Sequence, residues 1–311
     1  VREMHDDGTH LWVGSKLGLT VIDFENAVST DYELPQGHDL HDMVVLESHI
    51  VMVTEGGVWI ADITDGSLGD ISQWSFYPGR YTAGAQLVAD GGDDYVIALG
   101  FGGFGSVFQI NDLSITQLSV GNGISDAMSI GNATATSIIH ADVSSGPLTL
   151  FVGTDVGMFS VETSTARDAA VPNWKFYYSP EPTTIATDID ELRAIGAEGG
   201  ANPAAVNALE ADGPEGGQMQ VVWVGTPSGL HRLDLLSGFL THSGDYEHQG
   251  VDGVTVDSAN EIHSIHSTGD EILIGSGWGL WSLSGGYAAV YGMTNQEWVP
   301  GLISAITVHQ V

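Results

Sequence analysis

The stretch that decides the fold reads Leu11-Trp12-Val13-Gly14-Ser15-Lys16-Leu17-Gly18-Leu19. It consists of an apolar run, a glycine with a small residue, a few turn residues, and a second glycine followed by an apolar residue. This order is typical of two β-strands joined by a tight turn, because such turns often require a positive φ that glycine adopts without strain. We therefore expect a β-hairpin here.

The same phrase recurs along the rest of the chain. Its marker residues in the apolar runs are Trp12, Met52, Ala98, Phe151, Trp223 and Leu273, which are separated by steps of 40, 46, 53, 72 and 50 residues. Apolar stretches before the phrase and aromatic stretches after it supply two further strands in most units. Four strands per unit and a period in this range predict an all-β fold, a β-propeller of four-stranded antiparallel blades. We expect one domain over residues 1–311 with six blades, seven being the alternative.

Two segments bear on the number of blades and on the surface. Residues 302–308 resemble the first strand of a further unit and would pair beside the N-terminal unit to close a six-bladed ring. If the chain is excised from a longer protein, a seven-bladed ring is possible. The longest step contains an insertion, residues 179–220, that joins two blades on the face of the glycine turns. Loops on such a face commonly carry function.

The repeats resemble the propeller repeat of sensor domains in hybrid two-component regulators, whose core phrase is apolar-Trp-Ile-Gly-Thr, a short turn and Gly-Leu. The agreement is good in residues 11–19, 151–158 and 222–230, and fair in residues 273–280. The resemblance implies a propeller that binds ligands, often carbohydrates, outside the cell. The motif itself is structural and contains no catalytic residue, and no kinase part accompanies it, so signalling is not implied.

Charge excludes several classes of partner. Asp and Glu total 40 whereas Lys and Arg total 7, which gives a formal net charge of -33. Such a field repels phosphate, so nucleic acid and anionic membrane surfaces are poor partners. Self-repulsion of this size is reduced by salt or divalent cations, which suggests a saline setting and makes calcium the one cofactor to consider. No apolar run approaches the roughly 18 residues of a membrane span.

Candidate catalytic and metal-binding residues emerge when the repeats are aligned on their glycine phrases. The aligned position, just after the apolar part of the innermost strand, holds His5, Glu47, His140, Glu210 and His266. The histidines His5, His140 and His266 could act as acids or bases, and Glu47, Glu210 and His266 could bind a metal. Because equivalent residues of different blades are distributed around a ring, these side chains would also lie apart from one another. On a regular strand, His263 and His266 would point to opposite faces.

Candidate ligand-binding residues lie in loops. Trp278 falls in a turn of the last unit, where an indole can stack on a sugar ring. The acidic residues Asp188, Asp190 and Glu191 lie in the insertion and could contact a ligand. Trp12 and Trp223, by contrast, lie inside predicted strands, so we assign both to the core.

The sequence favours a non-enzymatic module that binds a protein or carbohydrate ligand at the cell surface or outside the cell, beside other domains of a parent chain. A polysaccharide lyase or hydrolase that uses the channel histidines and glutamates is the first alternative. A structural unit of a cell-surface array is the second. Convergence of two imidazoles in one pocket would favour the enzyme over the binding module.

Overall fold

The fold is all-β, as predicted. The described residues of the computed structural model are 2–35, 38–64, 67–87, 94–102, 104–111, 114–119, 133–141, 148–155, 157–163, 174–177, 205–212, 221–227, 229–235, 240–244, 261–268, 272–276, 279–284 and 287–290. Within them the strands form six four-stranded antiparallel sheets, each built from four strands that are consecutive in the chain. This confirms the predicted four-stranded repeat.

The strand bounds follow the predicted repeats. The first three sheets comprise β1 (Glu3–Asp6), β2 (His10–Ser15), β3 (Gly18–Asp23) and β4 (Val28–Glu33); β5 (Leu40–Val45), β6 (His49–Thr54), β7 (Gly57–Asp62) and β8 (Ser75–Pro78); and β9 (Tyr81–Leu87), β10 (Asp94–Gly100), β11 (Gly105–Asn111) and β12 (Ser114–Ser119). The last three comprise β13 (Ala135–Ala141), β14 (Leu148–Thr154), β15 (Gly157–Thr163) and β16 (Trp174–Tyr177); β17 (Ala208–Asp212), β18 (Val221–Thr226), β19 (Gly229–Asp234) and β20 (Leu240–Gly244); and β21 (Ile262–Ser267), β22 (Ile272–Ser276), β23 (Gly279–Ser284) and β24 (Tyr287–Val290). Two short 3-10 helices, η1 (Ser67–Gly69) and η2 (Ile71–Gln73), connect β7 to β8.

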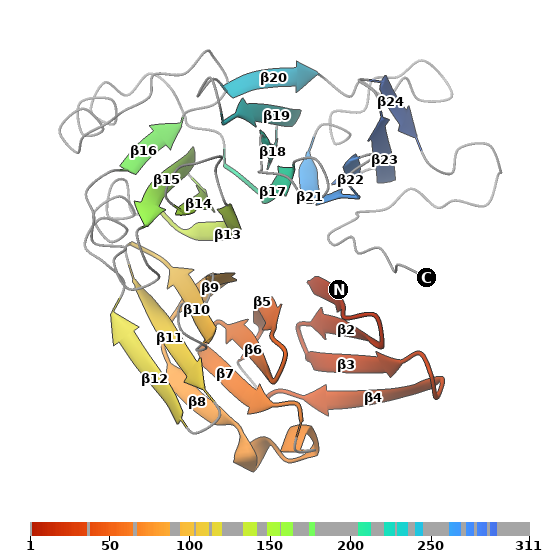
Figure 1. Ribbon diagram of the computed structural model, residues 1–311, viewed down its shortest axis with the longest axis vertical. Helices are drawn as coiled ribbons and strands as arrows, with labels where there is room; N and C mark the ends of the chain where they lie inside the picture. Colours follow the sequence, from red (N-terminus) through yellow and green to blue (C-terminus); the bar gives the residue numbers. More distant parts are fainter. Residues whose placement is uncertain are drawn as a thin grey trace.

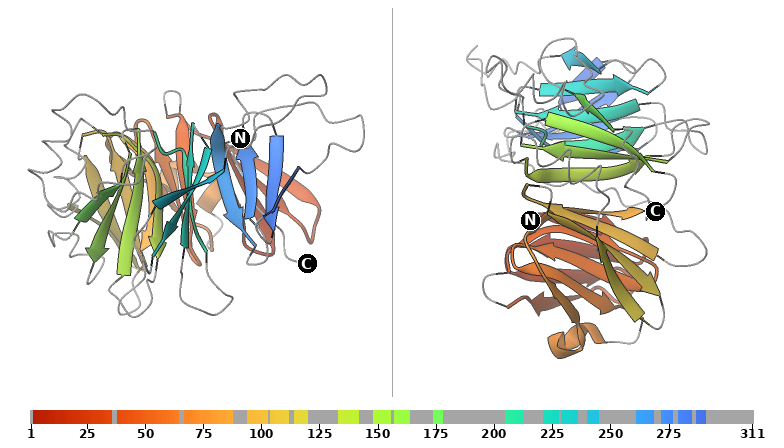
Figure 2. Two further views of the ribbon diagram at one scale, coloured as in Figure 1. Left: turned by 90° about the horizontal axis from the view of Figure 1, so that it is seen from above. Right: turned by 90° about the vertical axis from the view of Figure 1, so that its left-hand side faces the viewer.

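The sheets are arranged around an axis in chain order. Figure 1 shows β5, β9, β13, β17 and β21 nearest to this axis, and β1 occupies the same place in its own sheet. Neighbouring sheets contact each other through these innermost strands, from β1 to β5 and onward to β21. Figure 2 shows the sheets standing side by side with their faces toward one another. The predicted closure by residues 302–308 lies outside the described residues.

The glycine phrase forms the turn between the second and third strands of a sheet. At Gly18 the φ is +147°, and a side chain there would collide with the carbonyl oxygen of Tyr32. Where a threonine precedes the turn, its side chain stabilises the turn. Thr154 Oγ1, for example, donates to the Gly157 carbonyl oxygen at 2.6 Å. The same bond joins Thr54 to Gly57 and Thr226 to Gly229.

The core lies between the faces of neighbouring sheets. Trp12 is 3% exposed and packs with apolar residues of the second sheet, among them Leu40 and Met52. Trp223 is 8% exposed and packs against β21 and β22 through residues such as Ile262. Both indoles are therefore core residues, as predicted.

The predicted insertion includes part of a sheet. Residues 208–212 lie inside the range 179–220 and form β17, the innermost strand of the fifth sheet. Any extra segment between the fourth and fifth sheets therefore ends before this strand. Residues 179–204 lie outside the described residues.

A β-bulge near the start of an innermost strand ties one sheet to the next. The register of β13 shifts between Ala135 and Ser137, which turns Thr136 toward the following sheet. Thr136 Oγ1 there donates to the carbonyl oxygen of Val206. Equivalent donors are Thr82, whose Oγ1 lies 2.6 Å from the Ala135 carbonyl oxygen, and Asn207, whose Nδ2 lies 2.9 Å from the Ile262 carbonyl oxygen.

We expect Asn207→Ala to lower the free energy of unfolding by about 1 kcal/mol, because it leaves the Ile262 carbonyl without this donor. Urea denaturation of both proteins measures the difference. Asn26→Ala is the matched control, since the Asn26 amide bonds only to Asp23 in an exposed turn. An equal loss in both variants would contradict a role for Asn207 in joining the sheets.

Candidate ligand-binding cavity

A polar cavity of about 1010 Å³ lies on the axis of the sheets. All six innermost strands, or the residues next to them, contribute to its lining. The strands expose polar groups here because their apolar residues are used between the sheets. The cavity therefore combines a rigid wall with many hydrogen-bonding groups, which is the usual composition of an orientation-specific ligand site.

Five acidic residues line this cavity, Glu3, Asp6, Asp7, Asp42 and Glu210, and three of them, Glu3, Asp42 and Glu210, come from three different sheets. Asp42 Oδ2 accepts a hydrogen bond from the Gly84 backbone N–H at 2.7 Å, across to the third sheet. Glu210 Oε1 accepts one from the Ser267 N–H at 2.8 Å, across to the sixth sheet. Among the described lining residues the only Lys or Arg is Arg2, so the wall is acidic.

The pKa values of these carboxyl groups are raised. Burial raises the pKa of Glu3 to about 8, and the charges of Asp42 and Glu210 add to the shift. Burial raises the pKa of Asp42 to about 6, against the opposing hydrogen bonds from Gly84 and Met43. Burial also raises the pKa of Glu210 to about 7. Near neutral pH the cavity thus holds carboxyl groups in both protonation states.

Four histidines line the same cavity: His5, His41, His263 and His266. Burial lowers the pKa of His5, His41 and His266, so neutral imidazole is favoured at these positions. The expected alternation of His263 and His266 applies to a regular strand, and β21 is not regular at His263. The register of β21 shifts between Ile262 and Ser264, and this bulge at His263 breaks the alternation of a regular strand.

The strand register supports only part of the predicted alignment of candidate residues. His5, Glu210 and His266 pair with the marker residues Trp12, Trp223 and Leu273, so these three are equivalent. In the fourth sheet Ile139, and not His140, pairs with Phe151. In the second sheet Val51 is the register counterpart of Trp12 and pairs with Val44, and Glu47 lies beyond the end of β5. His140 and Glu47 are therefore not equivalent to the other three.

Glu210 and His266 are the predicted residues that come together. His266 Nδ1 lies 3.9 Å from Glu210 Oε1 at the wall of the cavity. His5 lines the cavity from the opposite end of the series of sheets. The backbone of His140 belongs to β13, while its side chain lies outside the described part of the structure.

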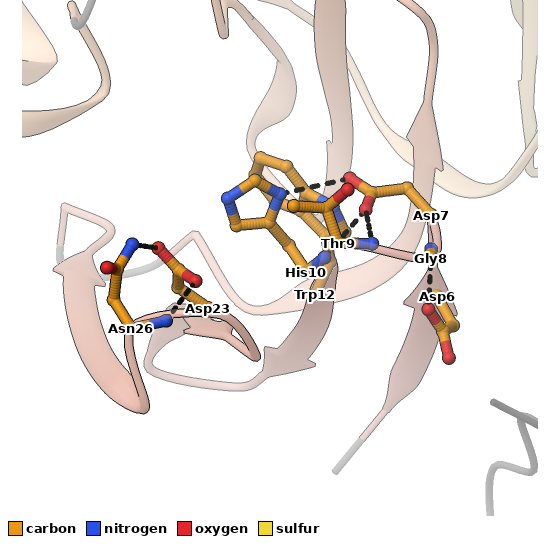
Figure 3. Close-up of polar contacts among 8 residues, drawn as sticks. All are labelled: Asp6, Asp7, Gly8, Thr9, His10, Trp12, Asp23 and Asn26. Carbon is orange, nitrogen blue, oxygen red and sulfur yellow. Dashed lines mark hydrogen bonds and ion pairs between the residues drawn. The ribbon is translucent and has the colours of Figure 1, made fainter. Parts of the chain in front are cut away.

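Glu47 lines a different cavity, of about 440 Å³, between the first and second sheets. Asp7 also lines it and accepts hydrogen bonds from the Trp12 indole at 2.8 Å and from the backbone of Thr9 and His10 (Figure 3). The Trp223 indole makes the same contact with Asp212, at 3.4 Å. Asp7 thus repeats a structural contact that positions a core indole.

The predicted metal ligands do not form one site in the described residues. Glu47 lies at one cavity, and Glu210 with His266 at the other. Across the described part of the chain, no group of three or more His, Asp or Glu side chains is arranged to hold a metal ion. Within the same residues, no helix is long and apolar enough to cross a membrane. Trp278, Asp188, Asp190 and Glu191 lie outside the described residues.

The glycine-turn face carries exposed apolar residues that the sequence pattern did not single out. Phe101 and Phe104, which are 55% and 45% exposed, lie between β10 and β11, and Phe76, 38% exposed, lies against Gly57 of the next turn. Phe76 also packs on Trp59, with ring centroids 4.4 Å apart. Phe101 and Phe104 lie in a turn next to glycines, which was the available signal, whereas Phe76 lies in β8.

Comparisons with known proteins agree on the fold. No family model and no curated protein matches this sequence. The extracellular domain of the putative one component system BT4673 from B. thetaiotaomicron matches 97% of this chain with a TM-score of 0.59 and 16% identity. The chain spans 35% of the length of that protein.

Two further solved structures are propeller-type repeat domains. The WD40 repeats of RRP9 match 98% of this chain and 82% of their own length, with a TM-score of 0.58 and 9% identity. The β-propeller domain of Cps50 (Swd1) from Myceliophteria thermophila matches 92% of this chain and 82% of its own length, with a TM-score of 0.53 and 12% identity. The chain therefore has the fold class of β-propeller domains.

Proposed function

We propose that this chain is a non-enzymatic ligand-binding module of an extracellular or cell-surface protein, and that the ligand occupies the central cavity. The observation that carries the proposal is the cavity of about 1010 Å³, which is lined by residues of all six sheets and by polar side chains of five of them. Its volume is at the upper end of the roughly 300–1,000 Å³ of small-molecule sites. The similarity to the BT4673 extracellular domain supports the location outside the cell. Either a six- or a seven-bladed closed ring would enclose this cavity.

The chemistry of the wall favours a neutral, hydroxyl-rich ligand, and we propose a carbohydrate. Carboxylates and neutral imidazoles accept hydrogen bonds from hydroxyl groups, and the Asn207 amide and Ser264 hydroxyl add donors. An anionic ligand would meet the field of Glu3, Asp42 and Glu210 without a compensating cluster of cations. The exposed aromatic residues of the glycine-turn face offer apolar surface to a longer chain of sugar rings.

Isothermal titration with a neutral disaccharide library tests this proposal, with uronic-acid disaccharides of matched size as the anionic comparison. We expect binding of neutral members only, and a loss of at least about tenfold (1.4 kcal/mol) in His266→Ala, because His266 lines the cavity. His10→Ala is the matched control, since His10 lines the smaller cavity. Failure of all neutral glycans to bind, or equal losses in both variants, would overturn the proposal.

A polysaccharide-cleaving enzyme is the second candidate, because Glu210 and His266 meet at the cavity wall 3.9 Å apart. A carboxylic acid with a pKa near 7 is suited to general acid catalysis at neutral pH. Incubation with neutral and acidic polysaccharides, followed by assay of new reducing ends or of unsaturated products, distinguishes the candidates. Cleavage that disappears in Glu210→Gln would favour the enzyme over the binding module.

A further inference from the structure

One surface of the sixth sheet has two features that, in earlier sheets, contact the sheet that follows. The first of these features is a notch at a glycine in the second strand of a sheet, filled by the apolar residue at the start of the following sheet. A Cβ added at Gly153 would lie 2.6 Å from Val206 Cγ1, and one added at Gly225 would lie 2.6 Å from Ile262 Cγ2. Leu40 fills the notch at Gly14 in the same way.

The second feature is the bulged polar residue at the start of the innermost strand. The donors of Thr82, Thr136 and Asn207 bond to the carbonyl oxygens of Ala135, Val206 and Ile262, each at the start of the following sheet. In the fourth and fifth sheets, the residue that fills the notch also accepts this bond. The notch and the donor of one sheet therefore contact the same residue of the following sheet.

The sixth sheet has both features. Gly275 pairs with Ser264 and Leu280 in the register in which Gly225 pairs with Ala208 and Leu230. His263 occupies the bulge, as Thr136 does in the fourth sheet.

The end of β22 is covered. Ser276 is 0% exposed, equal to Thr154 and Thr226, which stand at the same place in sheets that are followed by another sheet. Among the described residues, each innermost strand contacts the next one in chain order, from β1 to β21. No similarly extensive contact joins β21 or β22 to β1 in this part of the chain.

We infer that this face binds the segment 303–306, with Ile303 in the notch at Gly275 and the His263 ring N–H on the Ile303 carbonyl oxygen. The inner strands that fill the notches of the fourth and fifth sheets begin with an apolar, a polar, a small and an apolar residue, as in Val206-Asn207-Ala208-Leu209 and Ile262-His263-Ser264-Ile265, whereas the strand that fills the notch at Gly14 has an aspartate in third place. The segment Ile303-Ser304-Ala305-Ile306 repeats this order. The competing segment Val1-Arg2-Glu3-Met4 departs from this order at Glu3 and is closer to Leu40-His41-Asp42-Met43, so Val1 is included in the cross-linking test.

The inferred contact can be tested by cross-linking, because the chain contains no cysteine. The added Cβ at Gly225 lies 3.0 Å from Ile262 Cβ, and the one at Gly153 lies 3.1 Å from Val206 Cβ. These separations are close to the roughly 3.5–4.5 Å of a disulfide. We expect Gly275→Cys with Ile303→Cys to form an intramolecular disulfide during mild oxidation, measured as loss of free thiols and faster migration of the monomer on a non-reducing gel.

The control pairs Gly275→Cys with Ala305→Cys, because residue 305 alternates with Ile306, whose counterpart Ile265 faces the notch at Gly225. We expect at least tenfold slower oxidation in the control. Equal rates in the two pairs would overturn the inference. So would a disulfide between Gly275→Cys and Val1→Cys, which would identify the N-terminal strand as the occupant, or a disulfide found only in dimers, which would identify a second copy.

A volume exchange already present in the chain provides an independent test. In the second sheet, Val53 takes the place that Gly14 has in the first sheet, so the notch is already filled. The inner strand of the third sheet compensates with Gly84, where an added Cβ would lie 2.8 Å from Val53 Cγ2. We therefore expect Gly275→Val to lower the melting temperature and Ile306→Gly to recover at least half of that loss in the double variant. Additive losses in the double variant would contradict the inferred register.

Discussion

Gly225→Val is expected to lower the free energy of unfolding by about 3 kcal/mol, the upper end of the usual cost of overpacking a core. The new side chain has no free volume, because an added Cβ already lies 2.6 Å from Ile262 Cγ2 and 3.2 Å from Ile265 Cδ1. Both neighbours belong to β21, so relief requires the fifth and sixth sheets to move apart. Urea denaturation followed by tryptophan fluorescence measures the loss.

Gly69→Val is the control for this change. An added Cβ at Gly69 meets no atom within 4 Å, and Gly69 needs no positive φ. We expect a change within about 0.5 kcal/mol at this exposed position. Similar losses in the two variants would mean that the cost comes from the valine itself and not from the contact between sheets.

Glu3→Gln is expected to remove much of a loss of stability that the unchanged protein shows between pH 5 and pH 8. Burial, with the charges of Asp42 and Glu210, raises the pKa of Glu3 from an ordinary 4.5 to about 8. The folded state therefore keeps a proton that the unfolded chain has lost, so stability that is complete below pH 4.5 declines as the pH rises toward 8. Since one pKa unit corresponds to about 1.4 kcal/mol, we expect the variant to be more stable than the unchanged protein at pH 8 by at least ~1 kcal/mol.

Glu25→Gln separates this effect from the general repulsion of a chain with net charge -33. Glu25 is exposed, and its replacement changes the net charge by the same amount. Melting temperatures at pH 5 and pH 8 should differ as much in Glu25→Gln as in the unchanged protein. If the two variants flatten the pH dependence equally, the site at Glu3 is not its source.

Much of the fold could be predicted from the sequence, because the information is local and repeated. The spacing of the glycine phrases defines the hairpins, and alternation within a strand places Trp12 and Trp223 in the core. Both features depend on residues that are close in the chain. The same locality explains why the length of the insertion was overestimated, since β17 begins only a few residues after a stretch rich in glycine and proline.

The candidate site was less predictable because it depends on register. A shift of one residue moves a side chain to the other face of a sheet, so alignment on glycines alone misplaced Glu47 and His140. The bulge at His263, one of the residues that line the cavity, has no periodic signature. The acidic wall arises only when Glu3, Asp42 and Glu210, far apart in the chain, meet around the axis.

The contacts at the glycine notches make each sheet depend on the one that follows it. The bulged residues Thr136 and Asn207 donate to carbonyl oxygens at the start of the following sheet, those of Val206 and Ile262. During synthesis, a sheet that has just emerged leaves its donor and its glycine notch open until the next strand arrives. We therefore expect truncation after any of these sheets to weaken the last complete sheet as well as to remove those beyond it.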